Sequence, residues 1–238
     1  MVRQYDHEVQ GGTVVKPLVG SENDGPGNAT VIVPMAARQA GRIDRGVVLG
    51  CGINPHYGAI DPYAMAWSAV DEAIRNVVSV GGDPDQTSLC DNFCWGNPNL
   101  PDRLGALVRC GEGCYDGAMA YGLPYVSGKD SLNNEYMGAD GQKHAIPGTI
   151  LISAMSIVPN VNNTTTSDVK GEGNTLILVG NTRNELGASA AARQLGTTGG
   201  IVPQPVAQGP DTARAIYTAI SSGHIAACHD CSDGGLAL

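Results

Sequence analysis

One predicted helix constrains the fold of this chain more than any other stretch. Asp61 has the side chain of a helix N-cap, and Pro62 follows at the first helical position. Apolar residues then recur every four positions up to Val77, and a Gly-Gly pair ends the pattern after residue 80. A helix over 62–80 with one buried face is therefore expected.

Short apolar runs on both sides of this helix predict strands. They lie at 29–34, 45–52, 86–93, 124–128 and 149–158. A second helix is predicted over 102–121, and residues 1–27 are expected to form an extended arm or loop. Strands that alternate with helices indicate an α/β fold, and a hydrophobic content of 42% is typical of a globular chain.

A polar segment at 160–173, rich in Asn, Thr and Gly, predicts a domain boundary. We expect one domain over 1–160 and an incomplete second α/β domain over 161–238. Within the second, strands are predicted at 174–180 and 225–230, with a helix near 185–196 and another capped by Asp211. The sequence Asp233-Gly234-Gly235 resembles the start of a further helix, so a fragment of a longer chain is expected.

Composition and charge argue against several classes of function. The formal net charge is −9 and no basic cluster is present, which argues against nucleic-acid binding. No apolar window reaches the roughly 18 residues of a membrane span, and the N-terminus has no signal-peptide pattern, so a cytoplasmic protein is expected. The seven cysteines are then expected to be reduced, with a zinc site at spacings such as Cys228–Cys231 as the weaker alternative.

Polar side chains gather at four places in this pattern. Glu72 and Asn76 are four residues apart on the predicted helix, where their oxygens can share one hard cation, although a solvated helix face is the simpler interpretation. Asp91 ends a predicted strand, the edge at which ligands bind in open α/β sheets. His229 and Asp230 end another strand, before a predicted helix start that attracts anions.

The fourth place is the sequence Gly-Lys-Asp-Ser at 128–131, after a short strand. It is not a Walker motif, but the lysine can contact a phosphate and the glycine lets a ligand approach the backbone. These four clusters together favour nucleotide and metal chemistry. No serine or cysteine nucleophile can be assigned from spacing, and His56 in a loop is more typical of a structural histidine.

Several longer motifs resemble phosphoribosylformylglycinamidine synthase, in order along nearly the whole chain. They are RQYDHEVQGGTVVKPLVG, INPHYGAIDPYAMAWSAVDEAIRNVVSVGGDP, DNFCWGNP, SGKDSLNNEY, RNELGAS and HDCSDGGLAL. The resemblance is to the second half of that internally duplicated enzyme. It implies an aminoimidazole-ribonucleotide-synthetase-like N-terminal domain, whose sheet pairs with its twin, and part of the C-terminal α/β domain.

The resemblance also implies roles for particular residues. Those matched to ATP or substrate binding are Asp91, Gly128, Lys129 and Ser131, although Lys129 stands where the family has an asparagine. Those matched to magnesium around a second, structural nucleotide are Glu72, Asn76 and Asp230, and Asp130 is a further metal residue in variants with this loop. Asn28 replaces an aspartate of that set, and His56 lies opposite the catalytic histidine of the first half.

The implied activity is an ATP- and glutamine-dependent C–N ligase of purine biosynthesis, which converts formylglycinamide ribonucleotide to its amidine. Its implied cofactors are Mg²⁺ with ATP or ADP, and its implied partners are the first half of the synthetase and a glutaminase. The fragment is expected to be inactive alone and able to form a homodimer. The alternatives are a non-catalytic nucleotide-binding scaffold that docks a glutaminase, and a stand-alone kinase or synthetase of the same superfamily.

Overall fold

A six-stranded sheet lies at the centre of the computed structural model, which describes residues 8, 11–197, 199–232 and 235–237. Across the sheet the strands are β1 (Thr13–Val15), β4 (Thr30–Ile32), β5 (Gly46–Ile53), β10 (Thr149–Val158), β6 (Thr87–Cys94) and β7 (Tyr125–Ser131). Neighbouring strands are antiparallel except β6 and β7, which are parallel. Since β5 and β6 both run against β10, the strands β5, β6 and β7 end at the same edge of the sheet.

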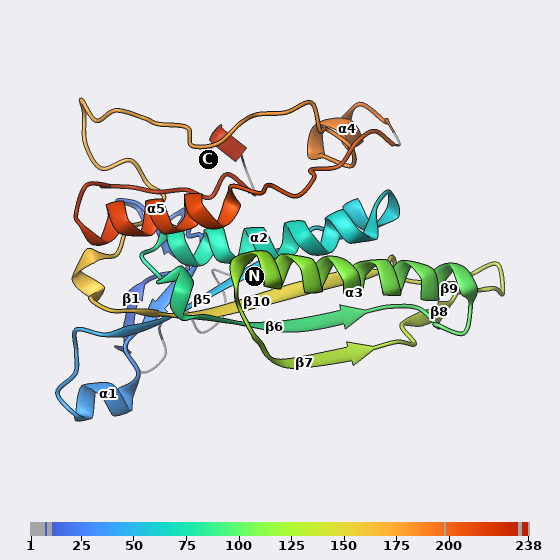
Figure 1. The fold of residues 1–238 in the computed structure, drawn as a ribbon, viewed down its shortest axis with the longest axis horizontal. Coiled ribbons are helices and arrows are strands. Elements are labelled where there is room, and N and C mark those ends of the chain that lie inside the picture. The colour runs from blue at the N-terminus through green and yellow to red at the C-terminus, as the bar shows by residue number, and fades with distance from the viewer. Residues whose placement is uncertain (1–7, 9–10, 198, 233–234, 238) are drawn as a thin grey trace.

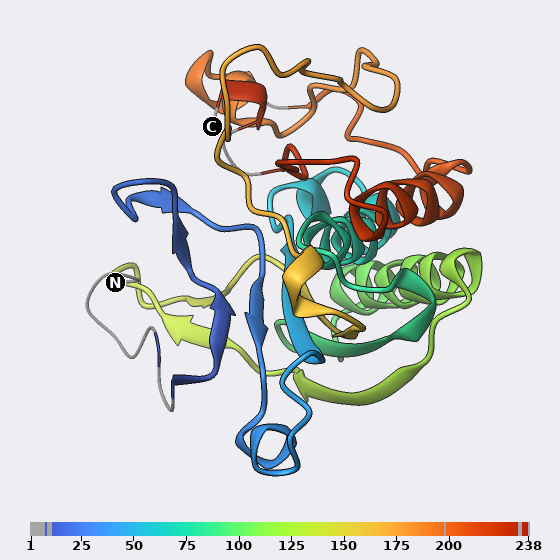
Figure 2. The same cartoon turned by 90° about the vertical axis from the view of Figure 1, so that its left-hand side faces the viewer.

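Two long helices pack on one face of this sheet, and a third lies outside them (Figures 1 and 2). They are α2 (Pro62–Ser79), α3 (Pro101–Tyr121) and α5 (Gly209–Ser221). The remaining elements are short: α1 (Met35–Gln39), α4 (Ala190–Gln194), and two small hairpins, β2 (Leu18–Val19) with β3 (Gly25–Pro26) and β8 (Glu135–Met137) with β9 (Lys143–Ala145). None of the helices in the described residues has the length and apolarity needed to cross a bilayer.

Helix α2 begins where the sequence predicts it. The carboxylate of Asp61 accepts hydrogen bonds from the backbone N–H groups of Tyr63 (3.0 Å) and Ala64 (3.2 Å), which satisfies two of the unpaired donors at the helix start. The helix lies directly on β5, because a Cβ at Gly52 would be only 2.0 Å from the carbonyl oxygen of Ala69. This close approach brings Glu72 and Asn76 on α2 within hydrogen-bond distance of the end of β5.

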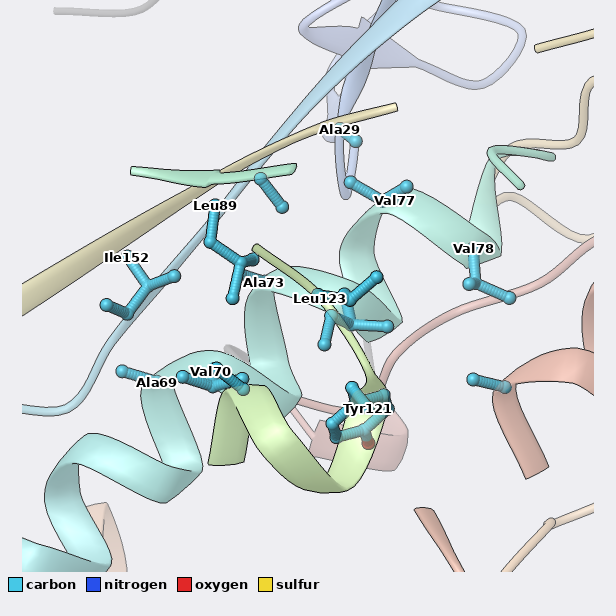
Figure 3. Packing of buried hydrophobic residues seen from close by; sticks show 14 of the residues in the cluster. Ala29, Ala69, Val70, Ala73, Val77, Val78, Leu89, Tyr121, Leu123 and Ile152 are labelled. Carbon is cyan, nitrogen blue, oxygen red and sulfur yellow. The ribbon is translucent and has the colours of Figure 1, made fainter. Parts of the chain in front are cut away.

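Apolar side chains from both layers form one core beneath the helices (Figure 3). Leu89 and Ile152 project from the sheet, and Ala69, Val70, Ala73 and Val77 project from α2. Leu89, Ile152 and Val77 are fully buried. The predicted apolar positions of α2 are buried, but burial is not limited to one face, since α3 and α5 also cover the helix and Val70, Ile74 and Val78 are buried too.

The other face of the sheet carries exposed apolar side chains. Leu49 and Ile53 on β5 are 47% and 46% exposed, and Met155 on β10 is 50% exposed. Met155 and Leu49 lie directly opposite each other in the antiparallel register. We call these three residues the open face of the sheet.

The predictions for residues 29–158 are confirmed in element type and order. The structure adds α1 and the β8–β9 hairpin there, which the sequence patterns did not predict, and it adds β1, β2 and β3 within the expected arm. The domain boundary near 160 stays a prediction.

Several predictions for 161–238 are wrong. Residues 174–180 form no strand, and Leu176, Ile177, Leu178 and Val179 are 83%, 78%, 55% and 52% exposed. Residues 225–230 also form no strand, because neither segment has a pairing partner among the described residues. The helix near 185–196 is limited to α4, and Asp211 lies in the first turn of α5, after the cap position. The predicted helix start at 233–234 lies outside the described residues.

Candidate functional site

The edge where β5, β6 and β7 end brings together the residues predicted to bind a nucleotide. In the parallel register of β6 and β7, Asp91 is beside Gly128 and Cys94 is beside Ser131. A Cβ at Gly128 would lie 2.2 Å from the Oδ1 atom of Asp91, so the aspartate side chain occupies the space that this glycine leaves free. The four residues matched to ATP or substrate therefore lie on two adjacent strands.

Asp91 shares its side of the sheet with a second carboxylate. Burial raises the pKa of Asp91, and the charge of Asp130 raises it further. Because side chains alternate along a strand, Asp130 follows Gly128 onto the side covered by the helices. Two negative charges thus face one another at this edge.

Lys129 and Ser131 point to the opposite side of β7. The Nζ atom of Lys129 donates to Ser131 Oγ over 2.6 Å, and lies 3.9 Å from Cys94 Sγ. The polar groups of residues 128–131 are therefore divided between the two faces of the sheet. Lys129 and Ser131 provide an exposed positive group on one face, and Asp91 and Asp130 provide carboxylates on the other.

A second polar group lies between α2 and the end of β5. Glu72 is 9% exposed, and its Oε2 atom accepts hydrogen bonds from the backbone of Ile53 and the side chain of Asn54, both over 2.8 Å. Asn76 is 7% exposed and donates through Nδ2 to the carbonyl of Cys51 (2.8 Å). The interpretation of these two residues as a solvated helix face is wrong, since both are buried.

Asp230 joins this second group from far along the chain. It is 8% exposed, and Ser232 donates to it through both its hydroxyl and its backbone N–H. Burial raises the pKa of Glu72, and the charge of Asp230 adds to that effect, while the hydrogen bond from Ile53 and the charge of Arg75 oppose it. The charge of Asp230 acts on Glu72, which places the two carboxylates in one neighbourhood, and Asn76 lies one helical turn after Glu72. That these three residues bind a metal ion stays a prediction.

The fourth residue of the predicted metal set lies apart from the other three. Glu72 contacts the end of β5, and Asp130 is on β7, three strands away across the sheet. Three interstrand spacings of about 4.8 Å amount to about 14 Å. Asp130 therefore belongs with Asp91, and the predicted metal set divides into two groups at the same edge.

Asn28 and His229 support the segment that carries Asp230. Asn28 donates through Nδ2 to Ser79 Oγ (3.0 Å) and to the carbonyl of Cys228 (3.2 Å), and its Oδ1 lies 2.8 Å from His229 Nδ1. His56 is exposed in the loop between β5 and α2. The contacts of Asn28 with Ser79, Cys228 and His229 give it a structural role beside the group formed by Glu72, Asn76 and Asp230.

Three residues near Glu72 were missed by the sequence interpretation. Asn54 donates to Glu72. Burial raises the pKa of the Tyr57 phenol, and the nearby charge of Glu72 raises it further. Arg75 pairs with Asp71 (2.7 Å), and only this i, i+4 spacing of opposite charges could have been noticed in advance.

The cysteines give no support to a zinc site. All seven are free thiols. Across the part of the chain that the structure describes, no group of three or more His, Cys, Asp or Glu side chains is placed to hold a metal ion. The second group differs from such a cluster because it combines two carboxylates with one amide.

Comparisons with known proteins agree with this architecture. Residues 27–158, more than half of the chain, match the family described as AIR synthase related protein, N-terminal domain. The phosphoribosylformylglycinamidine synthase subunit PurL of Thermoplasma acidophilum is 35% identical over 239 residues, which cover 99% of this chain and 30% of that protein. The chain thus spans about a third of the length of this curated relative.

Two solved structures are also similar. PurLQS from Thermotoga maritima has a TM-score of 0.53 and 26% identity, over 70% of this chain and 24% of that one. T. maritima PurL complexed with ATP has a TM-score of 0.50 and 25% identity, over 68% of this chain and 23% of that one. This chain therefore belongs to the AIR synthase related family, and nearly all of it is similar to one part of the PurL subunit of phosphoribosylformylglycinamidine synthase.

Proposed function

We propose that this chain supplies a nucleotide- and magnesium-binding part of a phosphoribosylformylglycinamidine synthase. In the complete enzyme it would take part in the ATP-dependent formation of an amidine from formylglycinamide ribonucleotide. Glutamine would provide the nitrogen through a glutaminase subunit or domain. The chain alone is expected to bind a nucleotide without completing this reaction.

The observation that carries the proposal is the meeting of Glu72 and Asp230 at one edge of the sheet. These carboxylates come from α2 and from a segment 158 residues later, and both are buried. Burial raises the pKa of Glu72 and the charge of Asp230 adds to that effect, so a bound cation would stabilise both carboxylates in their charged form.

The residues present fit magnesium. Hard divalent cations prefer carboxylate and amide oxygens, and Glu72, Asn76 and Asp230 would hold the ion. Bound there, the ion would neutralise phosphate charge on ATP or ADP. Asp91 and Gly128 on the neighbouring strands would position a nucleotide, and the ammonium of Lys129 would attract a phosphate on the open side.

The open face supports a partner in addition to a ligand. Leu49, Ile53 and Met155 are about half exposed on the same face of adjacent strands. A second sheet of the same kind would bury them, as the internal duplication of the family implies. We propose that this second sheet belongs to the first half of the synthetase.

Isothermal titration calorimetry of the chain with ADP and MgCl₂ tests the function. We expect binding that requires Mg²⁺ and is lost in Glu72→Gln and Asp230→Asn, each of which removes one charge and keeps the size of the side chain. Asp85→Asn is the matched control, because Asp85 is exposed and pairs with Arg214 on α5. Circular dichroism confirms that each variant is folded.

Other outcomes distinguish the alternatives. Nucleotide binding that is equal in wild type and both variants contradicts the assigned cation site. No nucleotide binding at all favours the scaffold alternative, in which the chain braces a partner only. Amidine formation by the purified chain with ATP and ammonia would overturn the proposal that another half is needed.

A further inference from the structure

Arg75 connects α2 to the segment that carries Asp230. Its side chain is 40% exposed, and its Nε atom donates to Asp71 Oδ2 over 2.7 Å. Its Nη1 atom donates to the main-chain carbonyl of Asp230. One guanidinium group therefore links two parts of the chain that are 155 residues apart in sequence.

The orientation of Arg75 is fixed from a third element. The hydroxyl of Tyr121, at the end of α3, donates to Asp71 Oδ1, while Arg75 binds the other carboxylate oxygen. Tyr121 itself is only 4% exposed and belongs to the core. Tyr121 in the core thus orients Asp71 by a hydrogen bond, Asp71 orients the guanidinium of Arg75, and the guanidinium binds the backbone carbonyl of Asp230. Arginine suits this position, since its planar fork donates in two fixed directions.

This link lies beside the proposed cation site. Arg75 precedes Asn76 by one residue and follows Glu72 by three. By holding the carbonyl of Asp230, it fixes the main chain from which the Asp230 carboxylate projects. The contacts of Asn28 with Cys228 and His229 hold the same segment on its other side.

The positive charge of Arg75 does not neutralise all the carboxylates around it, so it does not take the place of a bound metal ion. Asp71, Glu72 and Asp230 carry three negative charges and Arg75 carries one positive charge, which leaves a sum of −2 without His229. Asp71 pairs with Arg75 directly, while Glu72 accepts its hydrogen bonds from the end of β5. The site therefore keeps the charge that would attract a divalent ion.

We propose that Arg75 is a positioning residue, which holds the Asp230 main chain against α2 so that Asp230, Glu72 and Asn76 can bind one divalent cation. This inference rests on the cation site assigned under the proposed function. It assigns to Arg75 and Asp71 a part in the site although neither is a ligand.

Titration with MnCl₂, followed by electron paramagnetic resonance of free Mn²⁺, tests this role in the 238-residue chain. Arg75→Lys keeps the positive charge, but one ammonium cannot reproduce both contacts of the guanidinium. Asp71→Asn keeps Arg75 and weakens its anchor. We expect each to bind Mn²⁺ about 10- to 100-fold more weakly, the usual effect of losing a partner that orients a metal ligand. Arg214→Lys is the control, since Arg214 pairs with Asp85 (2.8 Å) on the surface, and unchanged affinity is expected.

A second measurement separates positioning from general destabilisation. Hydrogen exchange without metal should show lost protection at 228–232 in Arg75→Lys, with unchanged protection in α2 and β5. Circular dichroism identifies any variant that is unfolded, and Asp71→Asn then decides the question. Unchanged Mn²⁺ affinity in both Arg75→Lys and Asp71→Asn, with affinity lost in Glu72→Gln and Asp230→Asn, overturns the role of Arg75 and leaves the site standing. Unchanged affinity in Glu72→Gln and Asp230→Asn overturns the site itself.

Discussion

The carboxylate of Asp91 fills the space beside Gly128, so position 128 has no room for a side chain. A methyl group there would lie 2.2 Å from Asp91 Oδ1 and would force the carboxylate to move. We expect Gly128→Ala to weaken ADP binding about tenfold, equivalent to about 1.4 kcal/mol, because Asp91 would no longer lie where the nucleotide needs it. Calorimetry measures the affinity, with the neighbouring Ser127→Ala as control. Equal ADP affinity in the two variants would contradict a role of Asp91 in nucleotide binding.

Glu72 gives a pH dependence whose sign follows from its pKa. That pKa is raised above the ordinary value of 4.5 by burial and by Asp230, so between the unfolded and folded pKa values the folded state binds more protons. The contribution of Glu72 to the free energy of unfolding therefore falls as the pH rises through that interval. Glu72→Gln removes the charge, while its amide oxygen can still accept from Ile53 and Asn54.

We expect Glu72→Gln, in EDTA, to resist urea better than wild type at pH 8, and the difference to disappear below about pH 4, where the carboxyl is protonated in both states. Saturating Mg²⁺ should reverse the order at pH 8, because only wild type gains from the ion. A difference that does not change with pH would contradict this account.

At the scale of the elements, α3 contains two glycines with opposite surroundings. A Cβ at Gly113 would lie 2.3 Å from the carbonyl oxygen of Tyr63 on α2, whereas a Cβ at Gly111 would have no atom within 4 Å. We expect Gly113→Ala to lower the free energy of unfolding by about 1–3 kcal/mol through overpacking. Gly111→Ala should raise it by about 0.5–1 kcal/mol through helix propensity. Urea denaturation compares the two, and equal effects would argue against close contact of α2 and α3.

Elements governed by local chemistry could be predicted, and those that depend on distant partners could not. The start of α2 follows from Asp61 and Pro62, whose contacts lie within the helix itself. The apolar run at 174–180 has the composition of a strand, but a strand needs a neighbour to satisfy its backbone, and none pairs with it in the described residues.

The same distinction applies to the site. Glu72 and Asn76 are four residues apart on one helix, so their sequence spacing alone predicts that their side chains are adjacent. The position of Asp230 depends on Arg75 and Asn28, which are distant in sequence, and only the resemblance to a family suggested it. The division of Lys129 and Asp130 between two faces follows from strand alternation once β7 is known to extend to Ser131.

At the scale of the whole molecule, the open face predicts association. Leu49 and Met155 are paired across β5 and β10, and both are about half exposed. In the absence of another partner we expect the chain to self-associate through this face. Leu49→Lys and Met155→Lys should each shift it to monomer in sedimentation velocity, because a lysine there would lose its hydration in the interface. Met119→Lys, on the exposed side of α3, is the control. A wild-type chain that stays monomeric at high concentration would contradict this prediction.

The exposed run at 176–179 has a consequence for the life of the protein in a cell. Adjacent apolar side chains on an unpaired backbone are the features by which quality-control machinery distinguishes misfolded proteins from finished ones. Even with the sheet and its helices folded, the exposed apolar run at 176–179 would thus still be a feature that chaperones can recognise. How long such a molecule survives would depend on how soon another strand covers that stretch.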